Sequence, residues 1–333
     1  MINLIKNVKL NSNDFQKLHV LVIGDLMLDV YQSGNVSRIS PEAPVPIVNI
    51  ENSFERLGGA ANVCQNIVSL EAKCSVIGMI GNDRSGNTMK RLFNENGINS
   101  DQIIVNDLRP TTTKTRIIAD DQQVVRIDKE KISPITNSEE NEILLNLKKI
   151  INDIDVIVLQ DYNKGLLTEN LIREIVKISN KNSKPIFVDP KFDNFFAYKD
   201  VFLFKPNKKE VEKKLGFALN NIENINKAAK KIKKQLHSKN VLITLGENGM
   251  LLLSDDSKYL KIQTRAKKVH DVSGAGDTVI STLALFYTAG YSLAQSTIIA
   301  NIAAGKVCEY IGVVPIKFDD LKNTIKNHII NEL

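Results

Sequence analysis

Short apolar segments alternate with amphipathic segments along most of the chain. The apolar segments lie at residues 19–24, 74–80, 155–161, 184–189, 201–207 and 240–246. Within them hydrophobic residues follow one another without alternating with polar ones, which predicts strands buried on both faces, as in a parallel sheet between helix layers. The segments between them have helical spacing, at 62–72, 87–97, 141–153, 169–182 and 225–237. This order predicts an α/β fold with a mostly parallel, doubly wound sheet.

Two segments, residues 31–51 and 111–130, break this alternation. Both are rich in β-branched residues, are interrupted by proline or by polar pairs, and never become helical. We interpret them as strands of a small separate sheet that forms a lid. Because the sequence shows neither an internal repeat nor a low-complexity linker, we expect one continuous domain over residues 1–333 that carries this lid.

Composition narrows the function classes. The chain of 333 residues can bury a large core, and its three cysteines and four histidines lack the spacing of zinc ligands, so we expect neither a zinc site nor a disulfide. The first residues lack the apolar region of a secretory signal. No apolar run reaches the roughly 18 residues that a membrane span requires. We therefore expect a cytoplasmic protein.

Positive charge is in modest excess. Lys and Arg together number 44 and Asp and Glu 38, and much of the excess lies at 208–214, 227–234 and 265–268. Charges at helical spacing usually form a solvated face, and neither aromatic residues nor a nucleic-acid motif accompanies them, so we do not expect nucleic-acid binding. A mild attraction for phosphorylated small molecules fits the same charge.

The first candidate for chemistry is the glycine-rich sequence DVSGAGDT at 271–278, which precedes a long helical run. Its small residues are expected at the helix N-terminus, where unpaired backbone amides favour a phosphate. A carboxylate repels a phosphate, so Asp277 makes chemical sense only as the acceptor of a proton from a hydroxyl group. The alternative is that Ser273 and Asp277 are only helix caps.

A second glycine-rich sequence, RLGGAANVCQNI, lies at 56–67. Gly58 and Gly59 would let a ligand lie against the main chain, and Asn62 can bond to hydroxyl groups. Close packing of a helix on the sheet would explain the two glycines as well. The chain has no GxxxxGK[ST] sequence, and GAGDTV lacks the third glycine of GxGxxG, so P-loop and dinucleotide-binding folds are disfavoured.

Taken together, GGAAN at 58–62 and DVSGAGDT at 271–278 resemble the paired signatures of the ribokinase-like (PfkB) carbohydrate kinases. The resemblance implies a three-layer α/β/α sandwich with a β-sheet lid, ATP as the phosphoryl donor and a magnesium ion. It implies that Asp277 is the catalytic base. The anion hole is implied to be the backbone of Gly274, Ala275 and Gly276.

Other segments are similar to D-glycero-D-manno-heptose-7-phosphate kinases. These segments occur in the same order as in that subfamily, at 22–48, 122–128, 160–168, 188–191, 205–210 and 244–250. The similarity implies phosphorylation of the anomeric hydroxyl of the heptose 7-phosphate to the 1,7-bisphosphate, a step of ADP-heptose and lipopolysaccharide precursor synthesis. No HxGH nucleotidyltransferase sequence follows the kinase segments, so we expect a stand-alone kinase.

Two alternatives stay open. A ribokinase-like enzyme could use another acceptor, such as fructose 1-phosphate, ribose or a nucleoside. The same fold could also serve as a sensor of sugars or nucleotides without catalysis, although a binder has no need of the base in GAGD. Two departures from the family pattern are Ser281 with Thr282 after the second signature, and TLGENGM at 244–250 without the arginine that is frequent in the subfamily.

The expected substrate contacts combine this resemblance with charge and position. Cations on the lid segments suit a phosphate already on the sugar, and polar residues after parallel strands face the edge where open α/β sheets bind ligands. The expected contacts are Asp29, Arg38, Gly58, Gly59, Asn62, Lys114, Arg116, Asp161, Lys164 and Lys191.

The nucleotide side is inferred from the same resemblance. Asn207 and Glu210 resemble the NxxE motif, which is implied to influence magnesium through water, although a capping box would place the same two residues at a helix start. The expected nucleotide contacts are Asn207, Thr244, Gly246, Glu247, Gly249, Asn301 and Ala304. Because exposed lid edges are prone to pair, we also expect a homodimer formed through the lid.

Overall fold

The computed structural model describes residues 4–6, 8, 10–120, 122–264, 270–310 and 312–330. The basic run at 265–268 therefore lies outside the described residues. None of the helices in these ranges is long and apolar enough to cross a membrane.

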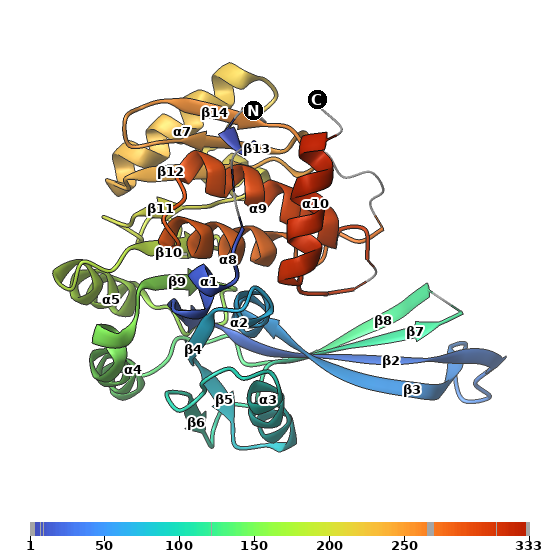
Figure 1. Cartoon of the computed structure of the whole chain (residues 1–333). Coiled ribbons are helices and arrows are strands. Elements are labelled where there is room, and N and C mark those ends of the chain that lie inside the picture. Colours follow the sequence, from blue (N-terminus) through green and yellow to red (C-terminus); the bar gives the residue numbers. More distant parts are fainter. Residues whose placement is uncertain are drawn as a thin grey trace.

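The body of the protein is built on an eight-stranded sheet (Figure 1). In sheet order its strands are β14 (Tyr259–Ile262), β13 (Met250–Leu253), β12 (Asn240–Thr244), β11 (Leu203–Phe204), β10 (Ile186–Asp189), β9 (Val156–Gln160), β1 (His19–Gly24) and β4 (Lys73–Ile77). The strands from β12 to β4 run parallel, whereas β13 and β14 are antiparallel to their neighbours. The mostly parallel sheet predicted from the apolar segments is thus confirmed.

Helices cover both faces of this sheet. One group is α1 (Asn13–Gln16), α2 (Ala60–Ser69), α8 (Ala275–Thr288), α9 (Leu293–Val307) and α10 (Phe318–Ile330). The other group is α4 (Asn137–Ile150), α5 (Glu169–Lys181), α6 (Lys208–Leu215) and α7 (Ile222–Leu236). Strand β1 shows the division, because Val20 and Val22 pack with the first group and Leu21 and Ile23 with the second. The continuous apolar strands therefore form the middle layer of an α/β/α sandwich.

The predicted strand at 74–80 is two strands. β4 ends at Ile77, and β5 (Met79–Gly81) pairs instead with β6 (Ile104–Asn106) in a two-stranded sheet beside α3 (Arg84–Glu95). The break falls at Gly78, where a Cβ atom would lie 2.5 Å from the side chain of Leu26. The chain turns out of the large sheet where it must make room for the start of the lid.

A four-stranded sheet projects from the body (Figure 1). Its order is β3 (Pro46–Gly59), β2 (Leu26–Ile39), β7 (Thr113–Ala119) and β8 (Gln122–Lys129). Segments 31–51 and 111–130 contribute to this sheet, but β2 already begins at Leu26 and β3 continues to Gly59. The lid therefore starts and ends directly at the edge of the large sheet, next to the first glycine-rich turn.

Several of the described helices begin with a side-chain cap, whereas α8 does not. Capping boxes start α4, α6 and α9, and in α6 the side chains of Asn207 and Glu210 each accept a hydrogen bond from the other's backbone amide. Helix α8 is instead preceded by Gly274, which has φ of 78° and gives no side-chain cap. The first turn of α8 is thus left open to a ligand, because the first amides of a helix have no intrahelical acceptor.

Candidate active site

Polar residues gather where neighbouring parallel strands end. Asp25 follows β1, Asp161 follows β9, Asp189 is the last residue of β10, and Lys205 follows β11. Each is buried. Because the carboxyl ends of parallel strands meet at one edge of a sheet, these side chains surround a common site, which is where open α/β sheets bind ligands.

Asp277, in the first turn of α8, receives three hydrogen bonds. The amide of Asn62 donates to Oδ2 at 2.7 Å, while Gln160 Nε2 and the hydroxyl of Tyr162 donate to Oδ1 at 3.1 and 2.7 Å. Burial raises the pKa of Asp277 to about 6, against the lowering effect of the donors Asn62 and Tyr162, and nearby Asp189 also raises it. At neutral pH the carboxylate is therefore ionised, yet basic enough to take up a proton.

The amides beside Asp277 form a small, positively polarised pocket. A Cβ atom on Gly274 would lie 3.2 Å from Nδ2 of Asn62, so the turn packs directly on that side chain. Nζ of Lys205 lies 3.7 Å from where a Cβ on Gly276 would stand. The amide of Ala275 donates to the carbonyl oxygen of Val272 at 3.2 Å, so it is already engaged. The amides of the next residues and the helix dipole remain available to an anion.

Lys205 and Asp189 were not predicted as site residues. Their side chains form a buried ion pair, with Nζ 2.8 Å from Oδ2, and Gln160 also donates to this carboxylate oxygen at 3.3 Å. The sequence offered one signal for them, since each is a charged residue at the end of a predicted apolar strand. Lys205 places a positive charge beside both the α8 N-terminus and Asp277.

The inner part of the lid contributes Asp29 and Arg116, which are joined by an ion pair of 2.6 Å. The guanidinium of Arg116 also lies 5.1 Å from the centre of the Tyr31 ring. Asp29 raises the pKa of Arg116 against the lowering effect of burial. Gly58 makes room for this arrangement, because a Cβ atom there would lie 2.2 Å from Oδ2 of Asp29.

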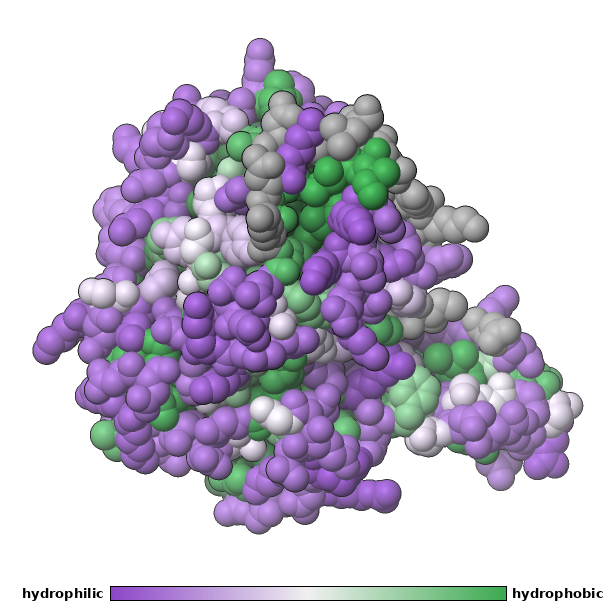
Figure 2. Space-filling model, in the orientation of Figure 1, coloured by the Kyte–Doolittle hydropathy of each residue, from purple (hydrophilic) through white to green (hydrophobic). Residues whose placement is uncertain are grey.

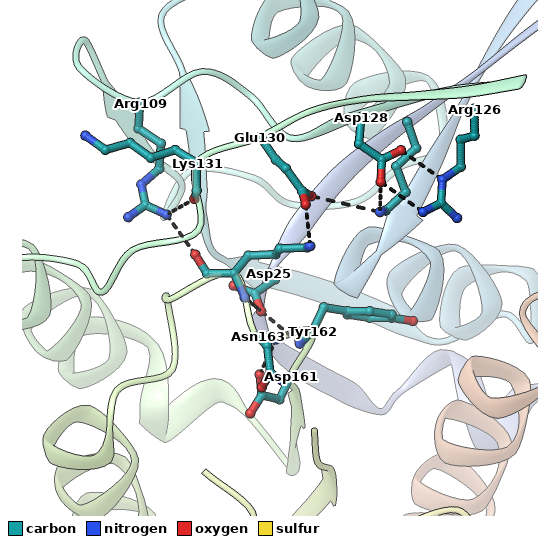
Figure 3. A network of polar contacts seen from close by, with 11 residues as sticks. Asp25, Arg109, Arg126, Asp128, Glu130, Lys131, Asp161, Tyr162 and Asn163 are labelled. Atoms are coloured by element: carbon teal, nitrogen blue, oxygen red, sulfur yellow. Dashed lines mark hydrogen bonds and ion pairs between the residues drawn. The ribbon is translucent and has the colours of Figure 1, made fainter. Parts of the chain in front are cut away.

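Lys114, expected as a cation for a phosphate, and Lys164, expected as a substrate contact at the edge of the sheet, are each paired with carboxylates (Figure 3). Nζ of Lys164 lies 2.8 Å from Glu130, which follows β8, and Nζ of Lys114 lies 3.2 Å from Asp128 and 3.9 Å from Glu130. Glu130 thus bridges the lid and the loop after β9. A phosphate at this position would have to share these lysines with the carboxylates.

Lys191, Asn207 and Glu210 form a further group. Nζ of Lys191 lies 2.9 Å from Oε1 of Glu210, while Oε2 accepts the amide of Asn207. The capping box considered from the sequence is therefore present. Each oxygen of Glu210 accepts one hydrogen bond, and the contact with magnesium through water that the resemblance implies stays a prediction. Among the described residues no cluster of three or more His, Cys, Asp or Glu side chains has the arrangement of a metal site.

A cavity of about 460 Å³ lies between β12, β13 and the helices α8 and α9. Its lining includes most of the expected nucleotide contacts: Thr244, Gly246, Glu247, Gly249, Asn301 and Ala304. It also includes Ala275 and Gly276, so the cavity opens onto the first turn of α8. Sequence reasoning missed the apolar part of the lining, to which Val272, Val279 and Cys308 belong. Asn207, by contrast, adjoins the cavity through its strand pairing with Thr244.

Of the ten expected substrate contacts, Asn62 is the one with a hydrogen bond to Asp277 within the described residues. Arg38 lies on β2 nine positions beyond Asp29, which at about 3.3 Å per residue is roughly 30 Å away. Asp161 accepts hydrogen bonds from the hydroxyl of Tyr198 at 2.7 Å and from the amide of Asn163 at 2.8 Å, and burial raises its pKa to about 6. The carboxylate of Asp161 thus bonds to its own loop and to Tyr198. Its contact with a substrate stays a prediction.

Comparison with known proteins gives a consistent result. The family model "pfkB family carbohydrate kinase" matches residues 17–317. "Bifunctional protein HldE" of a Nitratiruptor species is 38% identical over 306 residues, which are 92% of this chain and 64% of the relative. The protein of the same name from Sulfurimonas denitrificans is 41% identical over 303 residues, or 91% of this chain and 63% of the relative. The chain thus spans less than two thirds of the length of these relatives.

A solved structure shows the same fold. The ribokinase of Arabidopsis thaliana, determined with ribose and ATP, superposes with a TM-score of 0.74 at 19% sequence identity, over 93% of this chain and 99% of the other. At that identity the likeness concerns the architecture alone. It confirms the predicted three-layer arrangement of the sheet and helices.

Proposed function

Because the chain belongs to the pfkB family of carbohydrate kinases, we propose that it uses ATP to phosphorylate the anomeric hydroxyl of D-glycero-D-manno-heptose 7-phosphate. The product would be the 1,7-bisphosphate. The observation that carries this proposal is the position of Asp277, a buried carboxylate in the first turn of α8, between the 460 Å³ cavity and the base of the lid. A proton acceptor at a helix N-terminus suits phosphoryl transfer to a hydroxyl group.

In the proposed reaction the carboxylate of Asp277 accepts the proton of the acceptor hydroxyl. The hydroxyl oxygen forms a bond to the γ-phosphorus of ATP, the bond from that phosphorus to the β–γ bridging oxygen breaks, and ADP leaves. The hydrogen bonds from Asn62 and Tyr162 hold the carboxylate in place for this transfer. No further base is needed in the step.

Charge on the transferring group would be balanced by the open first turn of α8 and by Lys205. Magnesium, when bound with ATP, supplies further positive charge to the phosphates. Asn207 and Glu210 fit a contact with that ion through water, since their side-chain oxygens, which each accept one hydrogen bond, can also accept one from a metal-bound water.

Two observations support the heptose as acceptor. The segments similar to heptose-7-phosphate kinases occur in order along the chain, and identity to the two HldE proteins is 38% and 41% over most of it. Asp29 and Asn62 offer partners for sugar hydroxyls, and Arg116 and Lys114 offer cations for the sugar phosphate. A neutral sugar such as ribose is the second candidate, because these cations are paired with Asp29 and Asp128 in the structure.

The lid gives grounds for a homodimer. Within the described residues both outer strands, β3 and β8, have a free edge in the four-stranded sheet, and every described residue of β8 is exposed. Unpaired edges favour association with a second copy. We place the protein in the cytoplasm, where ATP and sugar phosphates are available.

The test is release of ADP from magnesium-ATP with a panel of acceptors, run beside Asp277→Asn. The panel contains heptose 7-phosphate, fructose 6-phosphate, fructose 1-phosphate, ribose and adenosine. Selective turnover of the heptose, lost in the variant, is the expected result. Turnover of another sugar would keep the mechanism and replace the substrate, whereas ATP binding without turnover of any acceptor would favour a sensor.

A further inference from the structure

The loop after β9, residues 161–166, connects Asp277 to the base of the lid. Within the loop, the hydroxyl of Tyr162 donates to Asp277, while Nζ of Lys164 binds Glu130. Figure 3 shows the ring of Tyr162 pointing away from Asp161, with its backbone next to Asp25. The loop thus contacts the proposed base from one side and the lid from the other.

Asp25 fixes the backbone of this loop. Its Oδ2 accepts the amides of Tyr162 at 2.8 Å and Lys164 at 3.1 Å, and its Oδ1 accepts the amide of Leu166 at 3.3 Å. Its own carbonyl oxygen accepts the amide of Ala60 at 3.0 Å, at the start of α2. One buried carboxylate therefore holds three alternate amides of the loop and ties them to the glycine-rich turn that carries Asn62.

The amide bonds explain why a carboxylate is tolerated at this buried position. Burial raises the pKa of Asp25, and the backbone hydrogen bonds of Lys164, Tyr162 and Leu166 act in the opposite direction. An asparagine could not accept all three amides, because its NH2 group replaces one of the two acceptor oxygens, and a neutral carboxyl would hold them less strongly, because its hydroxyl oxygen is a weaker acceptor. The geometry therefore depends on the ionised side chain.

We propose that Tyr162, held in place by Asp25, is a positioning residue that orients the carboxylate of Asp277 and keeps it ionised for proton transfer. This inference rests on the proposed kinase function. The hydroxyl donates to Oδ1 of Asp277 at 2.7 Å, and a donor to a carboxylate stabilises its charged form. Burial, together with Asp277 and Asp189, raises the pKa of Tyr162 well above its ordinary value, so the hydroxyl keeps its proton and remains a donor.

The other charged groups around Asp277 do not replace this donor. Asp189 and Lys205 form their own ion pair, and Lys191 pairs with Glu210, with its Nζ 5.3 Å from the centre of the Tyr162 ring. Asp189 raises the pKa of Asp277 and Lys205 lowers it. Because these two effects oppose each other, the pKa of Asp277 depends on each hydrogen bond that its carboxylate receives.

The chain offers a matched control. Tyr198 also donates a 2.7 Å hydrogen bond to a buried carboxylate, but to Asp161 rather than to Asp277. Tyr162→Phe and Tyr198→Phe each remove one hydroxyl from such a pair. Only Tyr162→Phe should change the titration of Asp277. A general loss of packing or of loop order would instead be seen in both variants.

The experiment follows the carboxyl ¹³C resonance of Asp277 in substrate-free protein labelled at aspartate, assigned by its loss in Asp277→Asn. We expect the titration of Asp277 to have its midpoint at about 6 in the parent protein. In Tyr162→Phe we expect about 7, a tenfold change in the ionisation equilibrium. Tyr198→Phe should leave the midpoint unchanged. The acid limb of the kcat profile for the accepted sugar should move in parallel with the titration.

An unchanged midpoint in Tyr162→Phe, with the variant folded, would overturn the proposal, as would an equal shift in Tyr198→Phe. Asp25→Asn provides a second variant, which keeps the hydroxyl but frees the loop, and the same upward shift is expected; no shift would contradict the role of Asp25. Because the titration needs no acceptor, it remains decisive even if the heptose is not the substrate. Failure of the acceptor panel would then count against the proposed function alone.

Discussion

The amide of Asn62 donates a 2.7 Å hydrogen bond to the carboxylate of Asp277, although 215 residues separate the two along the chain. A second bond between the same helices joins the hydroxyl of Thr278 to Asn66 at 3.1 Å. Each glycine-rich turn alone is compatible with a simple packing role. Joined in this way, α2 and α8 hold one carboxylate at the carboxyl edge of the sheet, and this geometry is what a proton acceptor requires.

Asp277→Asn should reduce turnover by about 10²- to 10⁴-fold, the usual contribution of a general base. The variant keeps the size of the side chain, and its one amide oxygen can accept either from Tyr162 and Gln160 or from Asn62, so the fold should persist. Initial rates of ADP release with the accepted sugar, compared with ATP affinity, check this. ATP affinity should change little, and undiminished turnover would remove Asp277 from the role of base.

Activity should rise with pH through about 6, because burial raises the pKa of Asp277 to about that value and only the ionised form accepts a proton. Below this pH turnover should fall about tenfold per pH unit. A profile of kcat between about pH 5 and 8 tests the expectation, with the nucleotide held saturating. A flat profile across this range would mean that another group accepts the proton.

The sequence predicts the body of this fold well because its signals are local. Continuous apolarity marks each buried parallel strand, and the Asn207–Glu210 pair marks the start of α6 within four residues. The two glycine-rich turns could likewise be found, since a close approach of the chain needs small residues. Their pairing through Asn62 and Asp277 could be expected only from the family resemblance.

The side-chain contacts between neighbouring strands could not be predicted from these local signals. The Lys205–Asp189 pair requires β10 and β11 to be neighbours, and alternation of strands and helices does not fix that order. The pairing of Lys114 with Asp128 depends on the antiparallel register of β7 and β8. Arg38 is expected at the site because its charge suits a phosphate. The charge of a residue, however, does not predict how far from the site it lies along a long strand.

Gly58→Ala should weaken sugar binding while leaving ATP binding intact. The new Cβ atom would stand 2.2 Å from Oδ2 of Asp29, so the carboxylate must move and its pair with Arg116 is disturbed. Overpacking of this kind costs about 1–3 kcal/mol, which corresponds to a rise in the KM of the sugar of roughly 5- to 150-fold. Separate titrations of sugar and ATP test this; an equal rise in both KM values would point to general damage.

Lys205→Met should destabilise the protein by about 3–5 kcal/mol, because it leaves the buried carboxylate of Asp189 without its cation. The double variant Lys205→Met with Asp189→Leu should recover much of this loss, since no charge then remains unpaired. Urea unfolding of the two variants and the parent gives the comparison. A loss below about 1 kcal/mol in the single variant would show that Asp189 finds solvent or another donor.

The lid should hold two copies of the chain together, and charges on it should separate them. Val125 and Ile127 lie on the edge strand β8 with 46% and 56% of their surface exposed, and Figure 2 shows hydrophobic side chains among the hydrophilic ones on the lid. Val125→Glu with Ile127→Glu should therefore convert a particle of twice the chain mass into one of a single chain mass in light scattering. Leu145→Glu, a comparably exposed site on α4, serves as the control and should leave the dimer intact. A single chain mass for the parent protein would contradict the lid-mediated dimer directly.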